Sequence, residues 1–313
     1  MRLVLPQHSR AELEARLPAG CEARWYADGD EVMAALPGAE VAWLDILFPP
    51  GPKTVLTAAK DPRWISSALA GVNGWPLDVL KQRGQVLTNG AGINAIPVAE
   101  FAVMGMMALA KDLRELIYLQ DRKEWPAQAP GRVEVAGSKA LVIGYGHIGR
   151  EIGSRLTGLG VEVTGVRRNP AGEAGMIGPG DWRARLGEFD WIVLAAAATS
   201  ETDGMIGPAE LAAMKPEAFI INIARGALID QKALIAAVKA QRLAGAMLDV
   251  TDPEPPPPSD PVWSTPGILM TSHCSGRSQL RFAERATALF LDNLARFRAG
   301  KPLENVVNLE LGY

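Results

Sequence analysis

The stretch KALVIGYGHIGREIGSRLTGLGVEVTGVRRNP, residues 139–170, carries the clearest information about the fold. Residues 139–145 have the apolar character of a buried strand, and they run into a glycine-rich turn, GYGHIG, at 144–149. Residues 148–159 then have the apolar spacing of an amphipathic helix, and 161–166 form a second strand-like run. A strand, a glycine-rich turn, a helix and a strand in this order predict a right-handed β-α-β unit of a parallel sheet.

The three glycines of the turn have separate physical reasons. Gly144 permits a tight turn, Gly146 lets the backbone approach a pyrophosphate, and Gly149 lets the helix pack on the strand. The N-terminus of a helix offers unpaired N–H groups and the positive end of the dipole, so His147 and Ile148 are expected to bind phosphate there. The turn predicts a dinucleotide-binding site, and the alternative is a plain glycine turn without a ligand.

The end of the second strand discriminates between cofactors. It carries Arg167 and Arg168. At this position an NAD site usually has an acidic residue, which accepts a hydrogen bond from the ribose 2′-hydroxyl. Two guanidinium groups would bind a 2′-phosphate but provide no acceptor for NAD. The expected cofactor is therefore NADP(H), with NAD(H) less favoured, and the alternative is that both arginines are solvated surface residues.

Strands and helices alternate along the rest of the chain. Further apolar runs predict strands at 3–5, 40–48, 64–70, 85–88, 191–195, 219–223, 244–250 and 268–271. Helices are predicted at 10–17 with Ser9 as the cap, 98–119, 208–214, 230–240 and 277–299. This alternation predicts an α/β fold, with a doubly wound parallel sheet in the second half.

The composition excludes several classes of function. The chain has 313 residues, enough for two domains, and its net charge of −3 gives no general attraction to nucleic acid or an anionic membrane. There is no long apolar span or signal-peptide pattern, and two cysteines cannot form a disulfide framework, which favours a cytoplasmic protein. Three histidines, with no C-x-x-C or H-E-x-x-H motif, make a metal centre unexpected.

Three chemically complementary side chains follow predicted strands in the second half. Arg225 comes after 219–223, Glu254 lies in a proline-rich loop after 244–250, and His273 follows 268–271. Open α/β sheets bind ligands at the carboxyl ends of their strands, so the three are expected in one active site. Each has a structural alternative: a loop cap, a solvated acid and a buried histidine. His8 is expected to be solvated or capping, which leaves His273 as the proton donor.

Four longer motifs join the glycine-rich turn in one pattern: IINIARGALID (220–230), LAGAMLDVTDPEP (243–255), TSHCSG (271–276) and LARFRAGKPLENVV (294–307). With them, the chain from about residue 39 onward resembles the D-isomer-specific 2-hydroxyacid dehydrogenases, which include glyoxylate/hydroxypyruvate reductases and phosphoglycerate dehydrogenases. The resemblance implies two Rossmann-like domains: a substrate (catalytic) domain of residues 1–95 and 275–313, and an inserted dinucleotide-binding domain of residues 96–274. It also implies a homodimer in which helix 98–119 takes part.

The resemblance further implies the roles of single residues. Arg225 would bind the substrate carboxylate and carbonyl, His273 would be the acid–base residue, and Glu254 would orient its imidazole. The remaining site residues are Gly71 and Val72, whose backbone N–H groups would bind the substrate carboxylate; Asp249, at the nicotinamide carboxamide; and Ala197, Thr202 and Ile223, lining the cofactor site. Leu47 and Phe48, at the end of an early strand, are expected to line the substrate pocket.

The predicted reaction is the reduction of a small 2-oxo acid, of the glyoxylate or hydroxypyruvate class, to the D-2-hydroxy acid. NADPH would supply the hydride and protonated His273 the proton. Two alternatives stay open: a dehydrogenase of another 2-hydroxy acid, such as phosphoglycerate or a bulkier acid, and a catalytically inactive nucleotide-sensing protein. The retention of Arg225, Glu254 and His273 argues against the second alternative.

Overall fold

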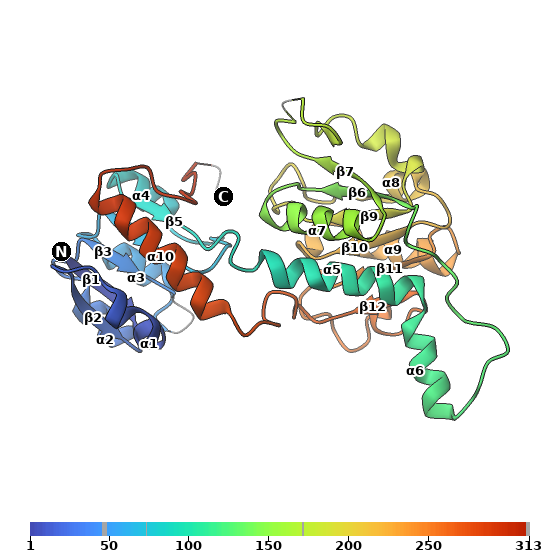
Figure 1. Ribbon diagram of the computed structural model, residues 1–313, viewed down its shortest axis with the longest axis horizontal. Coiled ribbons are helices and arrows are strands. Elements are labelled where there is room, and N and C mark those ends of the chain that lie inside the picture. Colours follow the sequence, from blue (N-terminus) through green and yellow to red (C-terminus); the bar gives the residue numbers. More distant parts are fainter. Residues whose placement is uncertain (46–48, 73, 171, 311–313) are drawn as a thin grey trace. The chain divides into compact units, whose positions relative to one another are not determined.

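The structure, a computed structural model, describes residues 1–45, 49–72, 74–170 and 172–310 (Figure 1). The chain divides into two compact units. The terminal unit comprises Met1–Asn94 and Gln279–Tyr313, and the inserted unit comprises Ala95–Ser278. These divisions lie close to the expected boundaries at 95/96 and 274/275.

The terminal unit is built on five parallel strands in the order β2-β1-β3-β4-β5. The strands are β1 (Arg2–Pro6), β2 (Glu22–Tyr26), β3 (Val41–Trp43), β4 (Trp64–Ser66) and β5 (Val86–Thr88). The helices are α1 (Arg10–Leu13), α2 (Gly29–Ala35), α3 (Pro52–Ala58), α4 (Leu77–Gln82) and α10 (Phe282–Arg298). The direction of strand addition reverses between β1 and β3, the switch point of this sheet.

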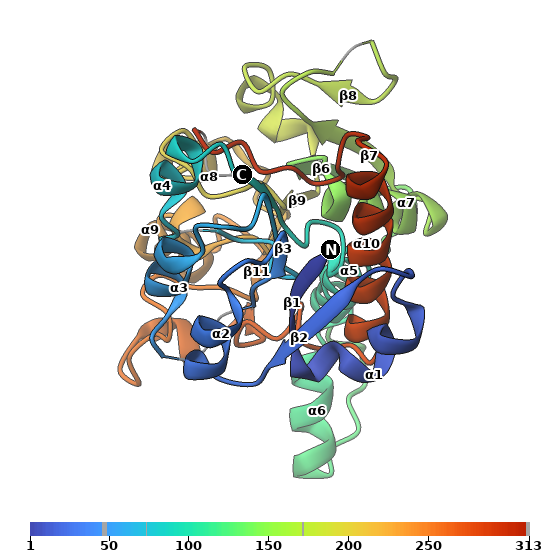
Figure 2. The same ribbon diagram turned by 90° about the vertical axis from the view of Figure 1, so that its left-hand side faces the viewer.

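Helices cover both faces of the five-stranded sheet (Figure 2). Val4 of β1 packs in a core with Val32 of α2 and Val55 of α3. Leu3 and Leu5, which alternate with Val4, belong to the opposite core together with Phe290 of α10. The sheet is therefore the middle layer of three.

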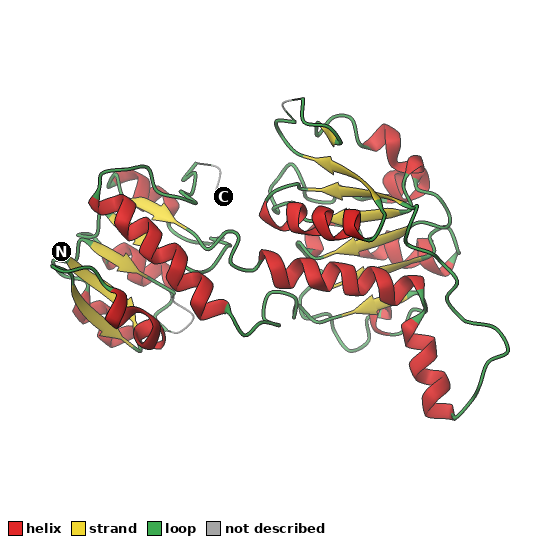
Figure 3. Ribbon diagram, in the orientation of Figure 1, coloured by secondary structure: helices red, strands yellow, loops and turns green. Residues whose placement is uncertain are grey.

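The inserted unit has seven parallel strands in the order β12-β11-β10-β9-β6-β7-β8 (Figure 3). The strands are β6 (Lys139–Ile143), β7 (Glu162–Val166), β8 (Met176–Ile177), β9 (Trp191–Leu194), β10 (Phe219–Asn222), β11 (Gly245–Leu248) and β12 (Ile268–Met270). The helices are α5 (Ala95–Ala110), α6 (Leu113–Arg122), α7 (His147–Gly158), α8 (Pro208–Ala213) and α9 (Gln231–Lys239). Its switch point lies between β6 and β9.

This sheet is also covered on both faces. Met106 of α5 and Ile152 of α7 belong to one core, and Leu211 of α8 and Leu234 of α9 belong to the other. The prediction of two doubly wound parallel sheets is confirmed. None of the helices among the described residues is long and apolar enough to cross a membrane.

The prediction of one helix over 98–119 is wrong, because the chain breaks between α5 and α6. Asp112 has φ of 46°, in the left-handed region, and its Oδ1 accepts a hydrogen bond from Glu115 N to begin α6. A later loop crosses the break: Val133 N donates to Ala110 O at 3.2 Å, and the Lys111 ammonium donates to Val133 O at 2.7 Å. The last carbonyl of α5, that of Ala110, thus has its donor in a distant segment of the chain.

Two other predicted helices differ from the structure, one in its cap and its end and the other in its start. Ser9 does not cap α1, because its hydroxyl donates to Pro6 O at 2.8 Å, and the α-helix ends at Leu13. The helix predicted at 277–299 begins at Phe282, because Arg277 N and Ser278 N both donate to Cys274 O in a turn. The strand predicted at 40–48 is β3, and residues 46–48 lie outside the described part of the chain.

Candidate active site

The glycine-rich turn packs so closely that two of its glycines cannot be replaced without overlap. A Cβ at Gly144, which has φ of 98°, would overlap the backbone of Ala195 at the end of β9. A Cβ at Gly149 would overlap the carbonyl oxygen of Gly144, so α7 lies directly against the turn. A Cβ at Gly146 would have no atom within 4 Å, which leaves space beside the backbone there. This is the pattern expected of a turn that a pyrophosphate approaches.

Helix α7 begins at His147, directly after Gly146. Arg150 N donates to Gly146 O, the first bond of the helical pattern. In an α-helix, each N–H group donates to the carbonyl four residues earlier. For His147, Ile148 and Gly149 that carbonyl would lie before the start of the helix, so helix geometry gives these three N–H groups no acceptor within it. The helix has 12 residues, so these groups lie at the positive end of a full macrodipole. The arrangement fits a dinucleotide pyrophosphate.

Arg167 and Arg168 follow β7, and both are paired with glutamates. Arg167 Nη1 lies 2.8 Å from Glu173 Oε2, and Arg168 Nη2 lies 3.1 Å from Glu201 Oε2. Both glutamates are exposed, so the ion pairs are the kind that contributes about 1 kcal/mol or less to stability. A doubly charged phosphate could replace these partners, since charge-assisted hydrogen bonds to phosphate are stronger.

The loop after β9 contains two of the expected cofactor-site residues. Thr202 Oγ1 donates to Ala197 O at 2.7 Å and accepts from Thr199 N at 2.8 Å, which closes the loop on itself. Ala197 is exposed, whereas Ile223, at the end of β10, is buried. The structure places Ala197 and Ile223 after neighbouring strands of one sheet.

Arg225 lies exposed in the turn after β10, and its neighbours fix that turn. Asn222 Nδ2 donates to Arg225 O at 2.9 Å, and Asn222 Oδ1 accepts from Ala224 N at 3.0 Å. A Cβ at Gly226 would overlap the backbone of Thr251, so the turn lies against the loop after β11. Asn222 and Gly226 thus position Arg225, and sequence reasoning assigned neither of them a role.

His273 and Glu254 are brought together by the loops after β12 and β11. His273 Nδ1 lies 2.5 Å from Glu254 Oε1. Both side chains are partly exposed, at 45% and 40%, so the imidazole can be reached from solvent while one of its nitrogens is bound. An imidazole in this contact has its second nitrogen, Nε2, available for proton transfer.

The backbone around His273 is unusual. Ser272 and His273 both have φ of 52°, in the left-handed region that residues with a Cβ adopt at a cost. His273 N donates to Asp249 O at 2.6 Å, and the Arg277 guanidinium donates to the carbonyl oxygens of both residues. The surrounding hydrogen bonds therefore fix a conformation that the chain would not otherwise favour.

The buried carboxylate of Asp249 is the centre of this loop. Its Oδ1 accepts from Thr271 Oγ1 at 2.6 Å and from Cys274 N at 2.9 Å, and its Oδ2 accepts from the Ser275 hydroxyl at 2.5 Å. Asp249 thus binds the residues on both sides of His273. These contacts fix the loop that carries His273. The sequence predicted for Asp249 only a place at the nicotinamide and did not predict this positioning function.

In the terminal unit, Gly71 and Val72 follow β4. Gly71 is exposed and Val72 is buried, with its carbonyl accepting from Trp75 N at 3.2 Å. Leu47 and Phe48 lie outside the described residues. Within residues 1–45, 49–72, 74–170 and 172–310, no three His, Cys, Asp or Glu side chains group as a metal site. His8 is exposed.

Comparison with known proteins identifies the family. The model of the D-isomer specific 2-hydroxyacid dehydrogenase, NAD binding domain, matches residues 103–275. A D-3-phosphoglycerate dehydrogenase of Archaeoglobus fulgidus is 31% identical over 82% of this chain, which spans only 49% of that relative. A glyoxylate reductase of Korarchaeum cryptofilum is 29% identical over 86% of this chain and 83% of its own.

A solved structure agrees with this result over nearly the whole chain. The D-isomer specific 2-hydroxyacid dehydrogenase family protein of Aeromonas salmonicida has 26% sequence identity and a TM-score of 0.84, and the match covers 98% of both chains. The family model matches more than half of the chain, within the unit that carries Arg225, Glu254 and His273. The chain belongs to the D-isomer specific 2-hydroxyacid dehydrogenase family.

Proposed function

We propose that this protein reduces a small 2-oxo acid, of the glyoxylate or hydroxypyruvate class, to the D-2-hydroxy acid with NADPH. The observation that carries the proposal is the 2.5 Å contact between His273 Nδ1 and Glu254 Oε1, within the segment that the family model matches. A histidine oriented by a carboxylate is well suited to general acid–base catalysis. The family match supports oxidation and reduction of 2-hydroxy and 2-oxo acids as the reaction class.

In the proposed mechanism, His273 donates its Nδ1–H to Glu254, whose charge stabilises the imidazolium. Its Nε2 gives a proton to the carbonyl oxygen of the 2-oxo acid. Arg225 binds the substrate carboxylate and stabilises the negative charge that develops on the carbonyl oxygen. The carbonyl carbon would receive the hydride that bound NADPH would supply. The backbone N–H groups of Gly71 and Val72 also bind the substrate carboxylate.

For the cofactor, the N–H groups at the start of α7 would bind the pyrophosphate, and Arg167 and Arg168 the 2′-phosphate. Ala197, Thr202 and Ile223 would line the nucleotide. Asp249, whose buried oxygens already accept hydrogen bonds from Thr271, Cys274 and Ser275, would order the loop beside the nicotinamide. The NADP preference is tested by Arg168→Ala, for which we expect the KM for NADPH to rise roughly tenfold and the KM for NADH to stay unchanged. Glu201→Gln is the matched control, because it removes the charge that pairs with Arg168 and leaves Arg168 itself in place. A wild-type preference for NADH would overturn this part.

The decisive experiment measures NADPH and NADH oxidation with glyoxylate, hydroxypyruvate, pyruvate and phenylpyruvate. We expect His273→Asn to lower kcat by about 10³-fold and Arg225→Ala to act mainly on kcat/KM. Arg242→Ala, another exposed arginine of the inserted unit, is the control and should match the wild type. Near-normal turnover in both site variants would refute the assignment.

A second substrate has a specific observation in its favour. The D-3-phosphoglycerate dehydrogenase of Archaeoglobus fulgidus shares 31% identity with this chain. Oxidation of D-3-phosphoglycerate with NAD⁺, at a higher kcat/KM than glyoxylate reduction, would therefore change the substrate assignment. NADPH binding without turnover of any of these acids would instead favour a nucleotide-sensing protein.

We also propose that the protein is a homodimer formed through α6. Figure 1 shows α6 extending away from the sheet of the inserted unit, and its Leu113, Leu116, Ile117 and Tyr118 are exposed. Exposed apolar residues gathered on one helix are typical of an interface. Sedimentation equilibrium should give the mass of two chains for the wild type and the mass of one chain for Ile117→Glu.

The free thiols Cys21 and Cys274 fit a reducing compartment, and we propose that the protein lies in the cytoplasm.

A further inference from the structure

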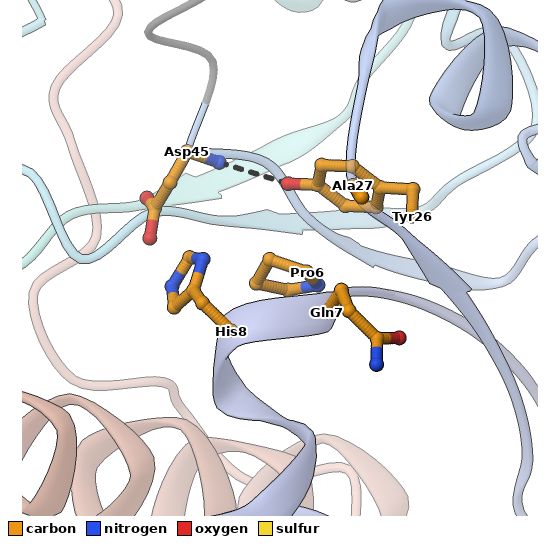
Figure 4. Close-up of a pocket in the computed structure, with 6 residues that line it drawn as sticks. All are labelled: Pro6, Gln7, His8, Tyr26, Ala27 and Asp45. Carbon is orange, nitrogen blue, oxygen red and sulfur yellow. Dashed lines mark hydrogen bonds between the residues drawn. The ribbon is translucent and has the colours of Figure 1, made fainter.

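A buried carboxylate of the terminal unit has no role in the reaction proposed above. Asp45 lies just after β3 and is only 9% exposed. It borders a pocket of about 300 Å³ at the carboxyl ends of β1, β2 and β3, the switch point of this sheet (Figure 4). The other residues that line the pocket are Pro6, Gln7, His8, Tyr26 and Ala27.

The carboxylate of Asp45 is bound by donors from two strands. Its Oδ2 accepts from Trp43 Nε1 at 2.7 Å, a contact within the exit of β3. Its Oδ1 accepts from Ser67 Oγ at 2.9 Å and from Ala68 N at 2.8 Å, both directly after β4. Asp45 therefore connects the exit of one strand to the loop that leaves its neighbour.

The loop after β4 is fixed further along by the same network. Ser67 Oγ, which donates to Asp45, accepts from Leu69 N at 3.0 Å. From the other side, Asn89 Nδ2 donates to Ala70 O at 2.8 Å, and Gly90 N donates to Leu69 O at 2.9 Å. Residues 67–70 are thus bound on both sides, and Gly71 and Val72 are the next two residues.

The hydrogen bonds to Asp45 offset part of the cost of burying its carboxyl. Burial raises the pKa of the carboxyl, and the hydrogen bonds from Ala68, Ser67 and Trp43 and the charge of His8 act in the opposite direction. Figure 4 shows the His8 ring on the pocket side of the carboxylate. Hydrogen bonds to an ionised group are about twice as strong as neutral ones. Because the carboxylate oxygens already have donors within the chain, the arrangement favours a structural connection over a ligand site.

We propose that Asp45 is a positioning residue for substrate binding, which sets the backbone of residues 67–72 so that the N–H groups of Gly71 and Val72 meet the carboxylate of the 2-oxo acid. This inference rests on the proposed function. It makes Asp45 act through the loop, without touching the substrate itself. Its loss changes the affinity for the 2-oxo acid and leaves the cofactor turn of the inserted unit as it is.

The test compares Asp45→Asn with Trp43→Phe in the full-length protein. The amide introduced by Asp45→Asn cannot satisfy all three donors, whereas Trp43→Phe removes one donor to Oδ2 and leaves both bonds to the loop. For Asp45→Asn we expect the KM for the 2-oxo acid to rise roughly tenfold, with kcat changed by less than about threefold and the Kd for NADPH unchanged. Trp43→Phe should lower Tm without raising this KM.

Two further measurements keep the outcome decisive. Ser67→Ala removes the hydrogen bond from Ser67 Oγ to Asp45 and should also raise the KM for the 2-oxo acid. This variant tests the inference if Asp45→Asn fails to fold. Hydrogen exchange of the 66–72 peptide should be faster in Asp45→Asn and Ser67→Ala, and unchanged in Trp43→Phe. An unchanged KM in both loop variants, or an equal KM rise in Trp43→Phe, overturns the inference. A wild type that reduces no 2-oxo acid refutes the proposed function, and hydrogen exchange alone then decides whether Asp45 orders the loop.

Discussion

The loops that leave β4 and β12, in the two different units, are organised by the same device. In each, a buried aspartate follows the neighbouring strand and accepts hydrogen bonds from the loop. Asp45 accepts from Ser67 and Ala68, and Asp249 accepts from Thr271. A buried carboxylate that is fully hydrogen-bonded can specify the position of a loop more sharply than apolar packing can.

A glycine also permits close packing near each aspartate: Gly90 packs against the loop after β4, and Gly226 packs against the loop after β11, which begins with Asp249. A Cβ at Gly90 would overlap the backbone of Ala68, and a Cβ at Gly226 would overlap that of Thr251. The loops after β4 and β12 differ in strain. Among the described residues of these two loops, only those after β12 include residues with a Cβ at positive φ, Ser272 and His273. The loop of His273 has more hydrogen bonds than the loop of Gly71 and Val72, because these bonds must also offset backbone strain.

The largest effect is expected for the packing glycines. Gly90→Ala and Gly226→Ala each place a methyl group against backbone atoms that cannot move aside, and each should lower the free energy of unfolding by about 3 kcal/mol. Gly158→Ala is the control, because its Cβ would meet no atom within 4 Å and α7 would gain a better helix former. Urea unfolding measures all three. If Gly90→Ala lowers the free energy of unfolding no more than Gly158→Ala does, the close packing of Gly90 against the loop after β4 is not important for stability.

The next effect is on catalysis. Asp249→Ala removes the acceptor for both sides of His273, so we expect kcat to fall about 10²-fold through misplacement of the imidazole. Because Asp45 is proposed to act on substrate binding and Asp249 on the imidazole, Asp45→Asn should mainly raise KM and Asp249→Ala should mainly lower kcat. Steady-state kinetics on both variants shows this, and equal kcat losses would contradict the separation.

A smaller catalytic effect is expected for Glu254→Gln. The amide keeps a contact with His273 but lacks the charge that stabilises the imidazolium, so kcat for 2-oxo acid reduction should fall roughly tenfold. Asp252→Asn, an exposed acid in the same loop, is the matched control. If both substitutions lower kcat equally, the general charge of the loop, and not the contact with His273, is responsible.

The smallest effect concerns the pH dependence of stability. Burial raises the pKa of Asp45, so the folded state binds this proton more tightly than the unfolded chain. The contribution of Asp45 to stability is therefore greatest at low pH and decreases as the pH rises above the ordinary carboxyl value of about 3.9. The asparagine side chain of Asp45→Asn does not titrate, so the stability of the wild type relative to this variant should fall as the pH rises from about 4 toward neutral. Urea unfolding across this range checks it, and a constant difference would contradict it.

The sheet of the inserted unit was largely predictable from the sequence. Central parallel strands are buried on both faces and appear as continuous apolar runs, such as Trp191–Leu194 and Phe219–Asn222. The edge strand β2, with the sequence EARWY, has no such run and was not predicted. The break at Asp112 was not predictable either, because it depends on the later segment around Val133 that crosses it.

The candidate site was predictable where residues follow a strand. Arg225, Glu254 and His273 were found from their positions after predicted strands, and the structure brings Glu254 and His273 into contact. Asn222 was inside a quoted motif but received no role, since its hydrogen bonds to the turn cannot be read from spacing. Asp45 gave no sequence signal, because its importance comes from donors 22 and 23 residues away.

The insertion of one unit into the other has a consequence for synthesis on the ribosome. Phe290 of α10 stacks on Trp43 and Trp64, with ring centroids 5.1 and 5.3 Å apart, and completes a core begun by the first residues of the chain. All of the inserted unit is translated between those tryptophans and Phe290. Domains generally fold as units during translation, so the inserted unit can complete its sheet first. Phe290 can cover the two tryptophans only after α10 has left the ribosome, and apolar surface exposed in this way during synthesis is prone to aggregation.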